Sequence, residues 1–133
     1  MHRILVLDDD RGTGRRCARW LAREGHEVLM ATSGHEAFET LETQKPEAVV
    51  LELLSPRSNG NPEIDARAVV EYMLAQGRGI PVVVCTNAPE HLEALRSWEA
   101  DAHVAVRRSM SGLRAALTRI FGRHTDAEAG AVE

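Results

Sequence analysis

The chain has 133 residues, of which 44% are hydrophobic, so it is long enough for one domain with a core of its own. A formal net charge of -4 is too small to indicate a nucleic-acid binder or a disordered acidic chain. The sequence has neither a signal peptide nor an apolar run approaching the roughly 20 residues that a membrane-spanning helix needs. We therefore expect a cytoplasmic, single-domain protein that binds neither nucleic acid nor membranes.

Strand and helix signals alternate along the chain. Short, continuously apolar runs predict strands at 3–7, 26–31, 48–53, 80–86 and 102–106. Apolar residues at helical spacing predict helices at 14–24, 33–42, 66–76, 89–98 and 113–121. Gly25 is expected to end the first helix, and Ser33 with Glu36 forms a capping box at the start of the second. Residues 124–133 lack an apolar period, so we predict a domain at 1–123 followed by a disordered tail.

This alternation predicts an α/β fold. Parallel strands need crossover connections, which are right-handed, and continuously apolar strands are typical of a sheet that is buried on both faces. We therefore expect a doubly wound, five-stranded parallel sheet with helices on both faces, in the flavodoxin-like strand order 2-1-3-4-5. Cys17 and Cys85 fall within apolar patterns and are expected to be reduced core residues.

A doubly wound sheet binds its ligands outside the carboxyl ends of its strands. Polar residues gather at those predicted ends: Asp8, Asp9 and Asp10, then Glu52, Thr86, Arg107 and Arg108. Mg²⁺ takes oxygen ligands, typically one or two carboxylates with water or phosphate. Asp8, Asp9 and Glu52 therefore predict an acidic pocket at this rim, with at most weak Mg²⁺ binding.

Over residues 3 to about 122 the chain resembles a bacterial response-regulator receiver domain. Asp8 and Asp9 are similar to the acidic pair of that family, and Glu52 occupies the phosphoacceptor position, with the family's proline four residues later. Thr86 and His103 match the switch hydroxyl and the switch aromatic residue. The resemblance implies two-component signalling with a protein partner, either a histidine kinase or a downstream regulator, by a monomer or a weak homodimer.

Two departures from the family pattern bear on function. The acceptor is glutamate instead of aspartate, and an ungapped match puts Val106 where the family has lysine, unless a one-residue bulge brings Arg107 there. The extra methylene adds about 1.5 Å of reach, which misplaces the nucleophile and is expected to carry the charge outward, toward the place of a phosphoryl group. We therefore predict a stand-alone, atypical receiver, or pseudo-receiver, that is not an enzyme and acts through protein–protein interaction without ordinary phosphorylation.

Two alternative functions and one question about a helix face remain open. The chain could be a receiver that still accepts phosphate from a histidine kinase, on Glu52 or a nearby aspartate. The run at 8–13, "DDDRGT", also approaches the aspartyl-nucleophile phosphatase pattern, but Gly12 stands where that pattern has Thr or Val and the chain has no room for a cap domain. Arg11, Arg15 and Arg19 share a helix face that is either simply solvated or a docking face for an acidic partner.

Overall fold

The computed structural model describes residues 1–7, 15–53, 68–73, 75, 79–86, 100–106 and 109–132. Several predicted features lie outside these residues. They are the aspartates at 8–10 with Arg11, the loop around Pro56, the helix at 89–98, and Arg107 with Arg108.

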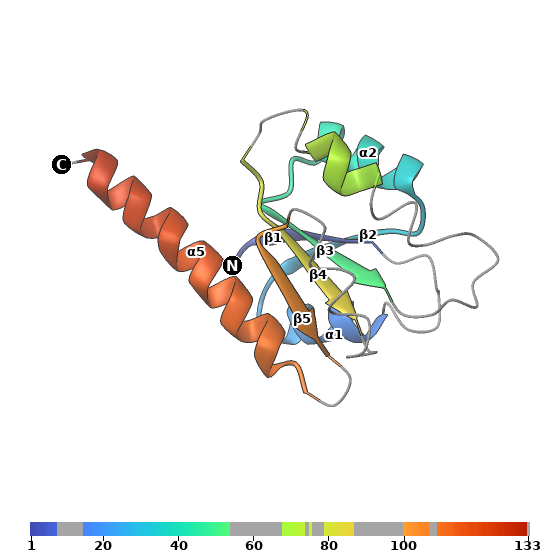
Figure 1. Ribbon diagram of the computed structural model, residues 1–133, viewed down its shortest axis with the longest axis horizontal. Coiled ribbons are helices and arrows are strands. Elements are labelled where there is room, and N and C mark those ends of the chain that lie inside the picture. Colours follow the sequence, from blue (N-terminus) through green and yellow to red (C-terminus); the bar gives the residue numbers. More distant parts are fainter. Residues whose placement is uncertain are drawn as a thin grey trace.

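Five parallel strands form one sheet in the order β2-β1-β3-β4-β5 (Figure 1). They are β1 (Arg3–Leu7), β2 (Glu27–Ala31), β3 (Ala48–Leu53), β4 (Val82–Thr86) and β5 (Ala102–Ala105). The register places Leu51 of β3 beside Leu7 of β1 and beside Val84 of β4. Because every neighbouring pair is parallel, the carboxyl ends of all the strands lie at one edge of the sheet. The predicted fold class and strand order are confirmed.

Helices cover both faces of this sheet, and each face has its own core. On one face α1 (Arg15–Arg23) and α5 (Ser111–Val132) pack on alternate strand residues. That core contains Ile4, Val6, Cys17, Leu21, Ala48, Val50, Val83, Cys85, Ala102, Val106, Leu113, Ala116, Leu117 and Ile120. On the other face lie α2 (Gly34–Thr43) and the helical residues 68–73. That core contains Leu5, Leu7, Ala31, Ala37, Leu41, Val49, Leu51, Val69, Val70, Met73, Val82 and Val84.

The helix ends follow local sequence signals. Gly25 has φ 91°, in the left-handed region that favours glycine, and it lies just after α1 as predicted. The Ser33 side chain caps α2 by accepting a hydrogen bond from the Glu36 backbone N–H over 3.2 Å. The Glu36 carboxylate in turn accepts from the Thr32 backbone N–H over 3.0 Å, one residue earlier than in the usual capping box.

The C-terminal helix is longer than the sequence predicts. The sequence predicts a disordered tail at 124–133, whereas in the structure α5 continues to Val132 and runs beyond the sheet (Figure 1). Alanine, which favours helix, occupies three of the seven positions of "DAEAGAV", so backbone propensity supports a helix where no apolar period does. Among the described helices, none combines the length and apolar character needed to cross a bilayer.

Candidate functional site

Glu52 lies near the carboxyl end of β3, on the face of the sheet that α1 and α5 cover. Side chains alternate along a strand, so Glu52 shares this face with Ala48 and Val50, which are both in the core beneath those helices. Its register partner on β4 is Cys85. Glu52 is only 2% exposed. A carboxylate enclosed to this extent needs hydrogen-bond donors, because burying an uncompensated charge is costly.

Cys17 of α1 supplies such a donor. Its Sγ donates a hydrogen bond to Glu52 Oε1 over 3.1 Å, and the Cys17 side chain is itself fully buried. The two residues are 35 positions apart in the sequence, so this bond ties α1 to the carboxyl end of β3.

The Cys17 thiol is held in its protonated form. The neighbouring Cys85 thiol raises the pKa of Cys17 above its ordinary value, and burial raises it further, whereas Glu52 and the Arg16 charge lower this pKa by less. Both cysteines are free and buried, which confirms the prediction that they are reduced core residues. A thiol that keeps its proton at neutral pH remains able to donate to Glu52.

The direction of Glu52 differs from the sequence prediction. The extra methylene was expected to carry the carboxylate outward, toward the place of a phosphoryl group. Instead the side chain is enclosed and its Oε1 accepts from α1, because the added reach brings the carboxylate to a thiol donor. Cys17 is thus a site residue that sequence reasoning missed. The available signal was its inward position on the helix that follows the first strand.

Val106 shows what occupies the position that corresponds to the family's lysine. Its backbone N–H donates to the Thr86 carbonyl over 2.8 Å, immediately after β5 ends at Ala105. The side chain is 1% exposed and belongs to the same buried cluster as Cys17 and Cys85. In an ungapped match, the residue at this position is therefore a buried apolar side chain of the core and not a cation.

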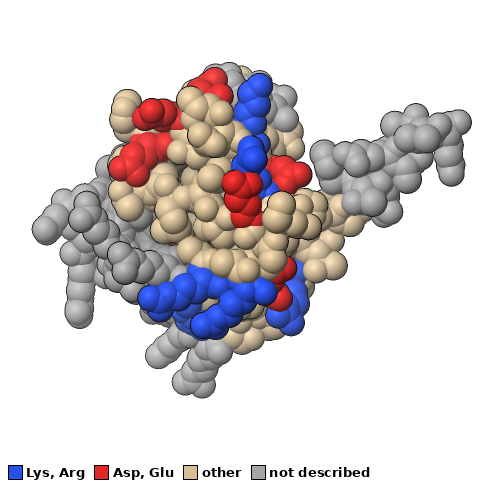
Figure 2. Space-filling model, turned by 180° about the vertical axis from the view of Figure 1, so that it is seen from behind, with Lys and Arg blue, Asp and Glu red and all other residues tan. Residues whose placement is uncertain are grey.

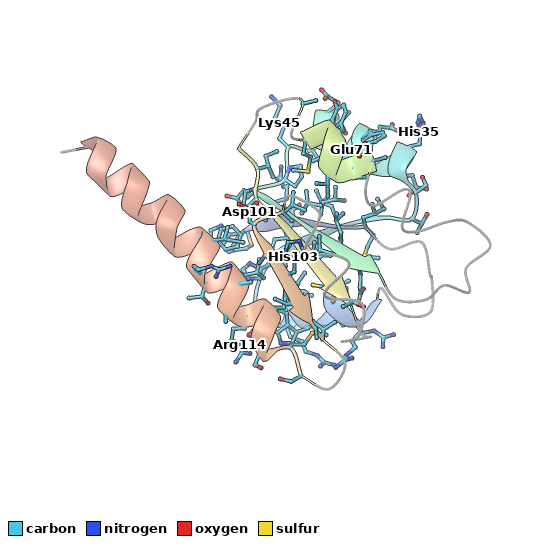
Figure 3. The ribbon with its side chains drawn as sticks, viewed as in Figure 1. His35, Lys45, Glu71, Asp101, His103 and Arg114 are labelled. Carbon is cyan, nitrogen blue, oxygen red and sulfur yellow. The ribbon has the colours of Figure 1, made fainter. Side chains whose placement is uncertain are left out.

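The two predicted switch residues lie on the opposite face of the sheet from Glu52. Thr86 ends β4 and is fully buried, and strand alternation puts it on the face of Val82 and Val84. His103 is half-buried on β5 beside Val84 in the register, and Figure 3 shows it on that strand. The structure thus places Thr86 and His103 on a common face of the sheet, and their switching role stays a prediction.

The predicted metal ligands fit Mg²⁺ only in part. Asp8 and Asp9 lie outside the described residues, and within those residues no group of three His, Cys, Asp or Glu side chains is placed to hold a metal ion. Glu52, the third predicted ligand, is enclosed and has a soft thiol, not a water-filled space, at its Oε1. Mg²⁺ prefers oxygen ligands and keeps several waters, so Glu52 in this position is a poor ligand for it.

Comparison with known proteins identifies the family. The model of the response regulator receiver domain matches residues 4–117, so the chain belongs to this family of two-component signalling domains. Response regulator MprA of Mycolicibacterium vanbaalenii is 32% identical over 100 residues, which are 75% of this chain and 41% of that protein. MprA of Mycobacterium avium is 31% identical over the same length. The chain therefore spans about 41% of the length of these curated relatives.

Solved structures agree on the fold. The response regulator TrrA from Thermotoga maritima, solved in complex with Mg(2+)-BeF, superposes with a TM-score of 0.73 at 22% identity and covers 90% of this chain and 99% of its own. NtrX from Brucella abortus, in complex with ADP, gives a TM-score of 0.77 at 20% identity and covers 98% of this chain and 29% of its own. Identities this low show a common fold only, so the site has to be described from the residues of this chain.

Proposed function

We propose that this receiver domain signals by binding another protein and does not take a phosphoryl group on Glu52. The observation that carries the proposal is the Glu52 carboxylate, which stands at the acceptor position, is 2% exposed and accepts a hydrogen bond from the buried Cys17 thiol. The domain would act as a binding module held in one state, or switched by an input other than phosphate.

Phosphoryl transfer depends on positioning and on charge neutralisation. A nucleophilic carboxylate must meet the phosphorus in line, and small displacements from the productive geometry are costly. Glu52 is both longer than aspartate and enclosed, so a phosphodonor has no direct approach to it in this state. At Val106 the ungapped match also lacks the cation that would stabilise the added charge. Both features support a domain that has an acidic residue at the acceptor position but does not carry out phosphoryl transfer to it.

The domain is proposed to be a binding module and not an enzyme. Weak Mg²⁺ binding is proposed for the pair Asp8 and Asp9, with Glu52 contributing little. Steady hydrolysis of a phosphate ester by the purified chain would contradict the proposal and favour the phosphatase alternative.

A protein partner, a histidine kinase or a downstream regulator, is proposed to dock at least partly on α1. Arg16, Arg19 and Arg23 are turned to the exterior of this helix at spacings of three and four residues. Figure 2 shows basic side chains gathered over this part of the molecule. Because the chain as a whole carries a net charge of -4, a local basic patch favours an acidic surface on the partner over generic polyanion binding.

Family membership supports a second candidate, a receiver that is phosphorylated on Glu52 or on a nearby aspartate. Variants separate the two functions. With Mg²⁺ and a small phosphodonor such as acetyl phosphate, Glu52→Asp should label little because Val106 remains. Glu52→Asp combined with Val106→Lys should label more, because an acceptor and its charge partner act as a unit. Circular dichroism must show that the double variant is folded, since it puts an ammonium into a buried cluster.

Labelling of the wild type as strong as that of the double variant would support the second candidate and overturn the first.

A further inference from the structure

The thiol of Cys17 donates a hydrogen bond to Glu52, the residue at the acceptor position, from a separate element of the fold. It comes from α1, whereas Glu52 and its register partner Cys85 come from adjacent strands. Cys17 is fully buried and Glu52 is 2% exposed, so the bond lies within the core and not at the rim. A buried bond between a thiol and a carboxylate is not displaced by water, unlike the exposed ion pairs of this domain.

We propose that Cys17 is a positioning residue that holds the Glu52 carboxylate inside the domain, and that without this thiol the carboxylate turns outward to solvent. The inference rests on the proposed function, because it explains why the acidic residue at the acceptor position is out of reach. It goes further by assigning the control of that residue to α1.

The Glu52 carboxylate has two possible positions, one inside the core and one in solvent. Inside, Glu52 loses its hydration and keeps only the donors that the protein provides, of which the Cys17 thiol is one. Outside, it regains water. Two methylenes give the side chain the freedom to make this change near the end of a strand. Removing the thiol leaves the cost of burial in place and takes away a compensating bond, so the balance moves outward.

Chemical labelling of carboxylates measures this position directly. A water-soluble carbodiimide with an added amine forms an amide only at carboxyl groups that it can reach, and peptide mapping by mass spectrometry gives the rate at each site. Glu39 of α2 is exposed and serves as the internal reference in every sample. In the wild-type chain, Glu52 should label far more slowly than Glu39.

Three substitutions at Cys17 separate the donor from the volume of the side chain. Cys17→Ala and Cys17→Val both remove the donor, one with a smaller and one with a larger side chain. Both should raise the labelling rate of Glu52 by about ten- to a hundredfold, the factor expected when one hydrogen bond to a charged group is lost. Cys17→Ser restores a donor and should return Glu52 to protection. The matched control is Cys85→Ala, which removes an equally buried thiol beside Glu52 and should leave Glu52 protected.

Two results would overturn the proposal. Glu52 could stay protected in both Cys17→Ala and Cys17→Val, which would show that packing alone encloses it. Alternatively, Cys85→Ala could expose Glu52 as much as Cys17→Ala does, which would show that the Cys17 donor is not what sets the position of Glu52. An unchanged Glu39 rate with native circular dichroism confirms that each variant is folded, and Cys17→Val carries the test if the alanine variant is not. The proposed function stands or falls separately, on phosphodonor labelling of the wild type.

Discussion

The hydrogen bond from Cys17 to Glu52 predicts a difference between two otherwise similar substitutions. Cys17→Ala and Cys85→Ala each remove one sulfur atom from a fully buried side chain, and each also removes the contact between the two thiols. The loss of packing should therefore be comparable, on the order of 1–2 kcal/mol in either variant. Of these two cysteines, it is Cys17 whose thiol donates to the Glu52 carboxylate, over 3.1 Å. A hydrogen bond to a charged group contributes about 1.5–3 kcal/mol, so Cys17→Ala should be less stable than Cys85→Ala by about that amount.

Urea denaturation followed by Trp20 fluorescence measures this difference, because Trp20 lies on α1 and packs against the core. A third variant, Glu52→Leu, removes the acceptor, and in that background the two cysteine substitutions should cost the same. The reasoning fails if Cys17→Ala and Cys85→Ala agree within about 0.5 kcal/mol in the wild-type background, the usual limit for independent effects. It also fails if the difference persists in the Glu52→Leu background.

Three further predictions concern pH, metal and assembly. Because the pKa of Cys17 is raised in the folded state, this thiol keeps its proton where the unfolded chain loses it, near the ordinary value of 9.0. Its contribution to stability is therefore complete below that pH and is lost above it, by about 1.4 kcal/mol per pH unit. Urea titrations between pH 9 and 10 should show that the free energy of unfolding falls less steeply in Cys17→Ser than in the wild type. Equal slopes in the two proteins would show that the Cys17 thiol is not the group responsible. Isothermal titration with Mg²⁺ should show weak binding that Asp9→Ala abolishes and Glu52→Gln barely changes, whereas equal effects would place Glu52 among the ligands. Sedimentation should show a monomer, or a weak dimer that dissociates in high salt because salt screens exposed ion pairs. Arg114 on α5 is already paired with Glu24 of the same chain, so it adds little to a dimer contact. A tight dimer that salt does not affect would contradict this prediction.

The sheet could be predicted from the sequence because its signals are local. The continuous apolar run that contains Val49, Val50 and Leu51 indicates a strand buried on both faces, and all three side chains are fully buried. Gly25 and Ser33 mark helix ends through backbone conformation and side-chain capping, which depend on a few neighbouring residues. These signals predict the elements correctly because they depend on neighbouring residues and not on contacts between distant parts of the chain.

The acidic position could also be predicted, but the direction of its side chain could not. Glu52 takes its place from the strand in which it lies, whereas its direction depends on a donor 35 residues earlier on another element. Whether Cys17 meets Glu52 depends on the rotation of α1 and its height above the sheet, and apolar periodicity gives the face of a helix but not these two quantities. An acceptor-position glutamate was therefore expected to turn toward solvent, where a carboxylate is ordinarily found.

The most direct test of the central claim is phosphodonor labelling of the wild-type chain. The protein is incubated with Mg²⁺ and acetyl phosphate, its intact mass is measured, and any modified peptide is mapped. The enclosed Glu52 carboxylate and the apolar Val106 predict no phosphoryl adduct on Glu52, while a receiver with an accessible aspartate, treated in parallel, becomes labelled. A stoichiometric, Mg²⁺-dependent and base-labile phosphoryl group on Glu52 would contradict this account and make the residue a working acceptor.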